Sequence, residues 1–497
     1  MPHTFVRRDV WDLQAEGGTW NDTLSWYSIA VDAMTLRSAK DVLDPTGWTY
    51  QAAMHGTKTP NPKPGVLWNR CQHGSWFFYP WHRMYLYYFE RIVRSVIVRD
   101  HRGPADWALP YWNYLSGGPH AALPPAFREP SRDLGPNPLY RELRNTTKGV
   151  DVNAGDPITG VDVPGQPSVV SYERSFSYRN FWSDNWVGPS FGGTQLKPAQ
   201  FGGNPGQLEI YPHGVVHDAV GGEHGLMGNV RTAASDPIFW LHHGNIDRMW
   251  ELWLRRGEGR ANPDHKDWRA QKFEFYDEDG NRQTMTAADV LDTARQLGYR
   301  YDNLHEVAPT ADAGGPRARR SPTPGRPRPE PELLAASERG TTLTGTGVTV
   351  GIALDPAARD TMAAAGAPRG AGDAQEGEDR FALALEGVSV DRQVGEVYQV
   401  YMRPSADAAD EYFVANLSFF GAQPHVDNDE DDAAHPGGDL SMSFDITDIV
   451  RRLTADGRWD RSRVTVDLRP MGTSGIADAA RPGHPPAVIR RFGIYRY

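Results

Sequence analysis

The chain has 497 residues, more than one hydrophobic core usually organises, so two domains are expected. Hydrophobic residues make up 39% of it and the formal net charge is −11, a globular composition without the basic surface that nucleic acids or anionic membranes attract. No apolar run is long enough to span a bilayer, so neither nucleic acid nor membrane is an expected partner.

The first residues and the cysteine content bear on location. The N-terminal sequence MPHTFVRRDVWDL lacks the apolar stretch of a secretory signal. Cys71 is the single cysteine, so no intramolecular disulfide can form and a reducing compartment is favoured. We therefore expect a cytoplasmic protein, with export alongside a partner protein as the alternative.

The first part of the chain, residues 1–308, has helical patterning. Apolar residues recur at helical spacing from Trp26 to Met34 and again from His82 to Val93. In the second helix His82, Tyr85, Leu86, Phe89 and Val93 share one face. This part of the chain is therefore predicted to be mainly α.

A different composition follows. Residues 309–340 combine prolines and arginines with few large apolar side chains, which predicts a linker. Residues 341–497 contain short alternating or β-branched runs separated by Gly, Pro and Asp, namely FALALEGVSV, EVYQVYMRP, YFVANLSFF, LSMSFDIT and RVTVDLRP. We expect an all-β sandwich or jelly roll there.

Six histidines lie in the segments that carry the clearest chemistry: His55, His73, His82, His213, His217 and His243. His213 and His217 are four residues apart, so on a helix they can hold one metal ion from one face. His82 and His243 both lie on predicted helix faces that are otherwise apolar, so their side chains should point into the core. The pattern indicates two groups of three imidazoles.

Three imidazoles per metal, without a thiolate or an obvious carboxylate ligand, suit copper or zinc better than magnesium, calcium or manganese. A zinc protease with the H-E-x-x-H motif would place glutamate directly after the first histidine of the helical pair, where this chain has Gly214. A zinc hydrolase is therefore disfavoured but stays open.

These segments resemble the type 3 copper proteins, a family that includes tyrosinases, polyphenol oxidases, catechol oxidases and haemocyanin units. HGSWFFYPWHRMYLYYFE, beginning at His73, is similar to the family's first copper site, and PHGVVH with DPIFWLHHGNIDRMW to its second. The resemblance implies a four-helix-bundle catalytic domain with two copper ions, one held by His55, His73 and His82, the other by His213, His217 and His243. It extends to about residue 305 and includes the Tyr299-x-Tyr301 motif, for which Arg7 or Arg8 would be the partner.

Two further residues acquire roles through the resemblance. Cys71 lies two residues before His73, as in family members whose cysteine sulfur is joined to that histidine, so a thioether between Cys71 and His73 is expected. Glu209, four residues before His213, matches a carboxylate that holds a water molecule near the second copper. As a base, Glu209 could take the proton of an incoming phenol.

The resemblance also predicts three residues of the substrate pocket. Gly214 replaces the asparagine that often follows the first histidine of the pair in efficient monophenol hydroxylases, so hydroxylation is in doubt. Val230 stands where many plant enzymes have a bulky phenylalanine gate, which predicts a more open site. His242 is expected to be a neighbour of the second copper and not a ligand.

The expected function is oxidation of ortho-diphenols to ortho-quinones by dioxygen at two copper ions, with a phenolic small molecule as substrate and a copper chaperone as a compatible partner. The β-rich part would cover the site and keep the chain latent until cleavage near Arg319 and Arg320. Alternatives are a tyrosinase that also hydroxylates monophenols, an o-aminophenol oxidase and a haemocyanin-like dioxygen carrier. No oligomeric state is predicted.

Overall fold

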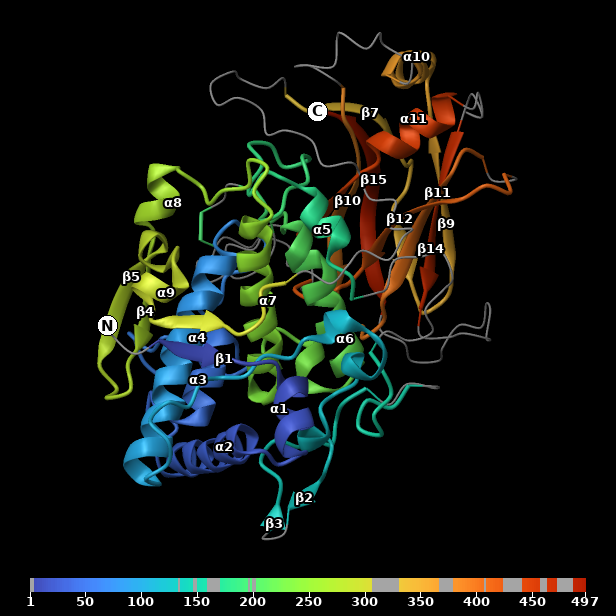
Figure 1. Ribbon diagram of the computed structural model, residues 1–497. Helices are drawn as coiled ribbons and strands as arrows, with labels where there is room; N and C mark the ends of the chain where they lie inside the picture. Colours follow the sequence, from blue (N-terminus) through green and yellow to red (C-terminus); the bar gives the residue numbers. More distant parts are fainter. Residues whose placement is uncertain are drawn as a thin grey trace.

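The computed structural model describes residues 4–132, 135–145, 150–158, 170–194, 197–198, 203–305, 330–365, 379–405, 408–422, 440–455, 463–471 and 486–497. Figure 1 shows a helical part, drawn in blue to yellow, beside a β-rich part drawn in orange and red. The predicted division into a mainly α and a β-rich region is confirmed. Most of the expected linker, with Arg319 and Arg320, lies outside the described residues.

The helical part is organised around α4 and α7, which pack against each other, while α2 packs against both α3 and α4. Its helices are α1 (Val10–Gly17), α2 (Asp22–Lys40), α3 (Trp48–His55), α4 (Phe78–Ser95), α5 (Glu173–Ser177), α6 (Val215–Gly221), α7 (Ile238–Arg255), α8 (Lys266–Ala270) and α9 (Thr293–Gln296). The predicted face of α4, from His82 to Val93, is buried. None of the described helices combines the length and apolar composition needed to cross a membrane.

The strands of the helical part are short. They are β1 (Phe5–Arg7), β2 (Ser131–Arg132), β3 (Gly135–Pro136), β4 (Lys272–Tyr276), β5 (Arg282–Thr286) and β6 (Tyr299–Tyr301). β1 pairs with β6 in parallel, which joins the two ends of the helical part. Of the two arginines predicted to contact the tyrosine motif, Arg7 does so, with Nη1 donating to the Tyr301 hydroxyl at 3.2 Å. Arg8 instead pairs with Glu16 at the surface.

Asp247 of α7 is the centre of a buried charged cluster beneath these strands. The hydroxyls of Tyr299 and Tyr301 each donate to its Oδ2 at 2.6 Å, and Arg83 Nε donates to its Oδ1 at 2.5 Å. Burial raises the pKa of Asp247, but Arg83, Arg7 and the two hydroxyls outweigh it and lower the pKa below its usual value. The carboxylate therefore ties α4, α7, β1 and β6 together in its charged form.

The β-rich part consists of two antiparallel sheets. One has the order β13-β10-β15-β7, with β8 also paired to β15, and the other has the order β12-β11-β14-β9. The strands are β7 (Glu332–Ala336), β8 (Thr341–Leu343), β9 (Val348–Ala353), β10 (Phe381–Val390), β11 (Tyr398–Arg403), β12 (Tyr412–Leu417), β13 (Leu440–Asp445), β14 (Arg463–Pro470) and β15 (Ala487–Arg496), with helices α10 (Pro356–Ala365) and α11 (Thr447–Ala455). Along the chain the strands change repeatedly from one sheet to the other.

The end of the predicted linker differs from expectation. Glu332–Ala336, within the expected 309–340 segment, forms β7 and pairs with β15. β7 is the edge strand of its sheet, and its burial pattern is mostly exposed or intermediate. An edge strand buries few large side chains, so composition alone did not distinguish it from a linker.

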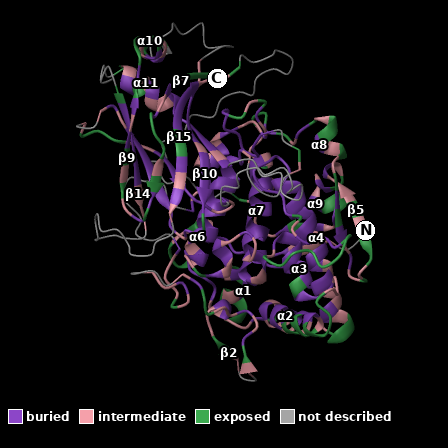
Figure 2. Cartoon of the chain, turned by 180° about the vertical axis from the view of Figure 1, so that it is seen from behind, coloured by how far each residue is buried: buried purple, intermediate pink, exposed green. Residues whose placement is uncertain are grey.

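The two parts share a continuous buried interior. Figure 2 shows buried residues running through α4 and α7 and through β10 and β15. Ala382 and Ala384 of β10 pack with Tyr495 and with Val187 of the helical part. At another point the backbone N–H of Ser441 donates to the Gly203 carbonyl at 2.9 Å. The first sheet is therefore covered by the helical part.

Replacing Asp247 by asparagine should destabilise the helical part by about 3 to 5 kcal/mol, because Arg7 and Arg83 would lose a buried partner. The midpoint of urea unfolding, followed by tryptophan fluorescence, measures this. Asp279→Asn, which removes the exposed partner of Arg99, should leave the midpoint unchanged. Since the pKa of Asp247 is lowered, its contribution is present above the pKa of the unfolded state and is lost as the pH falls through the folded pKa. Equal midpoints for the two variants would contradict this account.

Candidate metal centre

The six predicted histidines meet between α3, α4, α6 and α7. Ring centroids within the group of His55, His73 and His82, the first triad, lie 5.2 to 5.5 Å apart. Within the group of His213, His217 and His243, the second triad, they lie 4.6 to 5.5 Å apart. The two triads also touch each other, with the rings of His82 and His243 stacked at 4.5 Å.

Four of these imidazoles are fixed in the same way, by a backbone carbonyl that accepts from Nδ1. The pairs are His55 with Val230 at 2.9 Å, His82 with Phe78 at 2.8 Å, His213 with Glu209 at 2.9 Å and His217 with Met227 at 2.8 Å. A carbonyl only accepts, so each Nδ1 must carry the proton and each Nε2 is left with a free lone pair. This tautomer is the one that binds a metal through Nε2.

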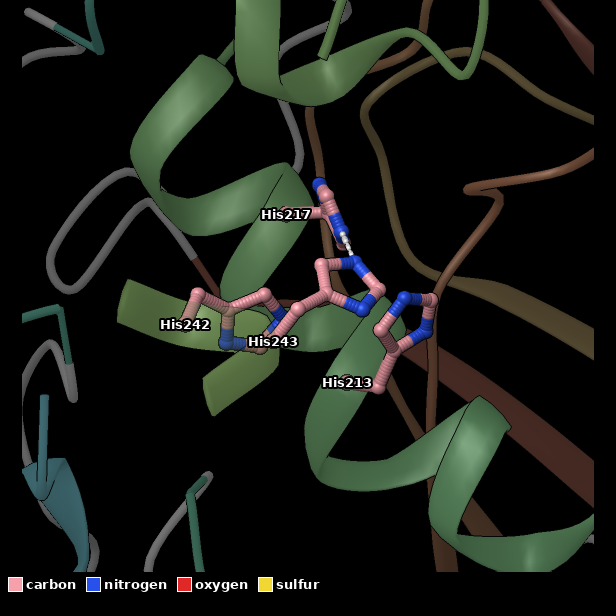
Figure 3. Close-up of side chains that lie close together, drawn as sticks. All are labelled: His213, His217, His242 and His243. Atoms are coloured by element: carbon pink, nitrogen blue, oxygen red, sulfur yellow. Dashed lines mark hydrogen bonds between the residues drawn. The ribbon is translucent and has the colours of Figure 1, made fainter. Parts of the chain in front are cut away.

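The Nε2 atoms point toward the centre of the cluster. The Nε2 atoms of His217 and His243 face each other at 3.3 Å (Figure 3). Two imidazole nitrogens bound to one metal ion at about 2.0 Å with a tetrahedral angle lie about 3.3 Å apart. Among the described residues, the Nε2 atoms of His82 and His213 have no hydrogen-bond partner. Buried lone pairs in this arrangement are suited to hold a cation.

The local helix geometry differs from the simple i and i+4 expectation. His213 lies in a π-helical turn, η5 (Glu209–Gly214), and only His217 lies in α6. The backbone of Tyr211 inside η5 is non-helical. The two histidine side chains nevertheless meet, because α6 continues directly from the turn at Val215.

Burial keeps these imidazoles neutral. The pKa is lowered well below its usual value, first by burial and then by neighbouring imidazoles, for His55, His82, His213, His217 and His243. A neutral imidazole can bind a metal, whereas the protonated form cannot. For the four imidazoles whose proton lies on Nδ1, namely His55, His82, His213 and His217, no proton has to be displaced from Nε2 when a metal binds.

Two predicted neighbours also lie at the cluster. His242 is buried, and one of its ring nitrogens lies within 4.8 Å of ligand atoms of His213, His217 and His243 (Figure 3). The Cys71 sulfur lies within 4.8 Å of ligand atoms of His55 and His73 and is fully buried. The positions therefore make His242 a geometric competitor for the second site and place Cys71 beside its predicted partner.

Glu209 reaches the cluster from the turn that carries His213. Its Oε1 accepts from the backbone N–H of Gly74 at 2.8 Å, while Oε2 has no hydrogen-bond partner among the described residues. Burial raises the pKa of Glu209 to about 8 against the lowering effect of the N–H groups of Gly74 and Gly206. A cavity of about 20 Å³ adjoins Glu209, His73 and His213, which is enough for a water molecule.

The other two predicted pocket residues occupy different places. Gly214 lines the small cavity beside Glu209. Val230 is buried and supports His55 through its carbonyl, and it lines a separate cavity of about 830 Å³ between the helical and β-rich parts. In this closed arrangement Val230 is therefore a structural support of the first triad.

Sequence reasoning missed Phe420, which reaches the histidines from the loop after β12. Its ring stacks on His217 with centroids 3.8 Å apart and planes 10° apart, and its edge faces His213 and His73 at 5.4 and 6.0 Å. The signal was the pair Phe419-Phe420 at the end of a predicted strand, which also suits an ordinary core.

Known protein families match three segments of this chain, including the one that carries the histidines. Residues 45–256 match the common central domain of tyrosinase, and residues 262–309 match the polyphenol oxidase middle domain. Residues 330–480 match a domain of unknown function. A tyrosinase of Hahella sp. (strain CCB-MM4) is 34% identical over 502 aligned positions, covering 94% of this chain and 95% of that protein.

The chain belongs to the tyrosinase and polyphenol oxidase family. It is therefore a copper oxidoreductase, as its sequence predicted. A catechol oxidase of Solanum tuberosum is 34% identical over an alignment that covers 55% of this chain. The same alignment covers 46% of that protein, so the chain spans about half of its length. The structure of latent apple tyrosinase has the same fold, with a TM-score of 0.60 at 22% identity, covering 99% of this chain and 97% of that one.

The predicted cytoplasmic location is contradicted by these relatives. Matched polyphenol oxidases of this family from plants, including the Solanum tuberosum catechol oxidase, are chloroplastic. Organelle transit peptides are amphipathic and rich in arginine and serine, not apolar. The missing apolar stretch on which the prediction relied therefore does not distinguish a cytoplasmic protein from a targeted one.

The competition between His242 and His243 for the second metal can be resolved by substitution. We expect His243→Ala to lower the bound copper from about two ions per chain to about one, because a site of three imidazoles loses a ligand. His242→Ala, the adjacent residue on α7, should retain both ions. Copper analysis of the two purified variants measures this, and the reverse result would make His242 the ligand.

Proposed function

We propose that the six histidines hold two copper ions, with His55, His73 and His82 as ligands of one and His213, His217 and His243 as ligands of the other. Support comes from the buried, neutral imidazoles whose Nδ1 atoms are tied to carbonyls and whose Nε2 atoms converge. Nitrogen-only ligand sets of this kind suit copper. The thioether between Cys71 and His73 is part of this proposal and would fix the orientation of that imidazole.

The proposed activity is oxidation of ortho-diphenols to ortho-quinones. Copper supplies the reversible one-electron chemistry through which two catechols reduce one dioxygen to two molecules of water. The observation that carries the proposal is the contact between the two triads, in which the His82 and His243 rings stack at 4.5 Å. Metal ions held by the two triads would therefore be neighbours, as in two-metal sites generally. The helices hold most of these ligands rigidly and keep bulk solvent away from them.

Glu209 is the proposed base for the phenolic proton. Glu209 lines a cavity large enough for one water molecule, and no other carboxylate lines that cavity among the described residues. Its Oε2 has no hydrogen-bond partner there. Burial alone raises the pKa of Glu209, whereas two nearby cations would lower it and favour the ionised form. An ionised Glu209 could then accept the proton directly or through the water.

The β-rich part is proposed to act as a lid. Phe420 covers His217 face to face, and the remaining cavity of about 20 Å³ is too small for a phenol ring. Docked in this way, the lid admits water or dioxygen but excludes the aromatic substrate. The full chain would then be latent, and the proposed cleavage lies near Arg319 and Arg320, in the part of the predicted linker that precedes β7.

This proposal implies a division into a catalytic domain of residues 1–308 and a β domain that includes β7. We propose that α3, α4, α6 and α7 form the expected four-helix bundle around the histidines and that the two sheets form a jelly-roll-like sandwich. In the absence of the lid, Gly214, Val230 and His242 remain the predicted pocket residues. A phenolic small molecule is the proposed substrate.

Oxygen uptake by the copper-loaded Phe420→Ala variant tests the activity, because the unmodified chain is proposed to be latent. We expect turnover of catechol with zinc unable to replace copper, and comparison with tyrosine and 2-aminophenol distinguishes the proposed catechol oxidase from a tyrosinase and an o-aminophenol oxidase. Glu209→Gln should lower turnover about 100-fold or more with unchanged copper content, because a general base is lost. If the Phe420→Ala variant binds oxygen reversibly but oxidises none of these phenols, the proposed activity is contradicted.

Removing the aromatic ring of the lid tests latency separately. Phe420→Ala in the full chain should raise catechol turnover at least about tenfold, because the phenol can then reach the histidines. The matched control is Phe413→Ala on β12, whose ring contacts Tyr401 within the β-rich part. Equal activity of Phe420→Ala and the unmodified, copper-loaded chain would show that Phe420 does not block the site.

A further inference from the structure

The lid contacts one element of the helical part, α6, at both of its ends. Near its start, Ser418 of the lid lies against Gly214 and Asp218. Near its end, Gln393 Nε2 donates to the carbonyls of Gly222 and Gly225, the latter at 2.9 Å. Because α6 also carries His217, the lid is attached to the element that presents one histidine of the second triad.

Asp218 is the polar centre of this attachment. It is buried, and its Oδ2 accepts from the Ser418 hydroxyl at 2.7 Å and from the Phe419 N–H at 3.1 Å. No arginine or lysine in the described part of the chain forms an ion pair with it. A buried carboxylate needs donors, and here the lid provides them in place of water.

Ser418 connects this carboxylate to the blocking residue. Its hydroxyl donates to Asp218 and accepts from the backbone N–H of Phe420 at 3.1 Å. The Phe420 ring lies over His217, and its position is thereby fixed by the carboxylate of Asp218, the residue that follows His217 in the chain. One hydroxyl thus links attachment of the loop with coverage of the site.

Gly214 provides the space for Ser418. A Cβ at position 214 would lie 2.6 Å from Ser418 Oγ and 3.1 Å from Ser418 Cβ. The first distance is far shorter than a van der Waals contact, so a larger residue at 214 would turn the Ser418 hydroxyl away from Asp218 or displace the docked loop. The lid itself therefore requires glycine next to His213.

We propose that Gly214, Asp218 and Ser418 form a latch that sets how tightly the Ser418–Phe420 loop closes the site, so that the residue at 214 determines latency. This inference rests on the lid proposed above. It gives Gly214 a role that does not depend on the phenol. Because glycine has no side chain, Ser418 fits against position 214, and for the same reason no asparagine amide lies beside the histidines. Latency and the identity of residue 214 are then coupled.

The hydroxyl of Ser418 is tested in the full, copper-loaded chain. Ser418→Ala should raise catechol turnover about tenfold, equivalent to about 1.4 kcal/mol in the closing equilibrium. Hydrogen exchange of the amides of residues 412–422 should accelerate in parallel. The matched control is Ser337→Ala, since the Ser337 hydroxyl accepts from Phe492 N–H entirely within the β-rich part and should affect neither readout.

The role of Gly214 is tested by a double-mutant cycle read by hydrogen exchange of the same loop, because Gly214 lines the pocket and turnover alone would be ambiguous. Gly214→Ala should accelerate exchange about tenfold. In the Ser418→Gly background, which removes the clashing atoms, adding Gly214→Ala should produce no further acceleration. Additive effects in the cycle would overturn the proposed contact.

The latch and the lid fail in different ways. If Ser418→Ala and Gly214→Ala leave loop exchange unchanged while Phe420→Ala activates the chain, the latch is wrong and the lid stands. If Phe420→Ala also leaves turnover unchanged in a chain that holds two copper ions, the lid itself is wrong. If Ser337→Ala accelerates hydrogen exchange of the loop as much as Ser418→Ala does, the effect is a general destabilisation of the β-rich part. That result would also overturn the latch.

Discussion

The structure depends on the placement of neutral imidazoles in a dry interior. Each of four histidines donates from Nδ1 to a backbone carbonyl, and those carbonyls belong to Phe78, Glu209, Met227 and Val230. The backbone thereby selects the tautomer and leaves the Nε2 lone pairs facing inward. Burial lowers the pKa of these groups, so the ligands are ready for a metal without losing a proton.

The buried Asp247 cluster supports this arrangement from the other side of the helices. Arg83 lies one residue after His82 on α4, and Asp247 lies four residues after His243 on α7, so their ion pair joins the helices that carry one histidine of each triad. Tyr299 and Tyr301 hold the same carboxylate from β6. The charges hold the two helices together without entering the metal centre.

The proposed lid controls whether a substrate can reach the histidines. Phe420 covers one face of His217, and the contact is a ring stack between planes 10° apart, so in the proposed lid this ring blocks that face. The loop that positions it is held by a carboxylate and a glycine of the catalytic part, Asp218 and Gly214. Opening the proposed lid would therefore expose a buried carboxylate as well as an aromatic ring. Closure depends on directed hydrogen bonds to Asp218 in addition to apolar contact.

The sequence by itself determined the helical and β-rich halves and five of the strands, because apolar residues at helical spacing and alternating β-branched runs are local patterns. The ligand candidates and the pairing of an arginine with the tyrosine motif came from the resemblance of whole segments to a known family. β7 escaped notice because its five residues, ELLAA, directly follow a proline-rich run and neither alternate nor contain a β-branched residue. A location inferred from a missing apolar stretch was wrong, since targeting does not require one.

Only the tertiary structure decided what depends on residues far apart in the chain. It chose Arg7 over Arg8, placed the Val230 carbonyl on His55, brought His242 within reach of the second triad and set Phe420 over His217. Gly214 in the sequence is only an absent side chain, and Ser418, more than 200 residues later, is what fills that space. Such contacts follow from how two folded surfaces meet, and no local pattern of residues encodes that.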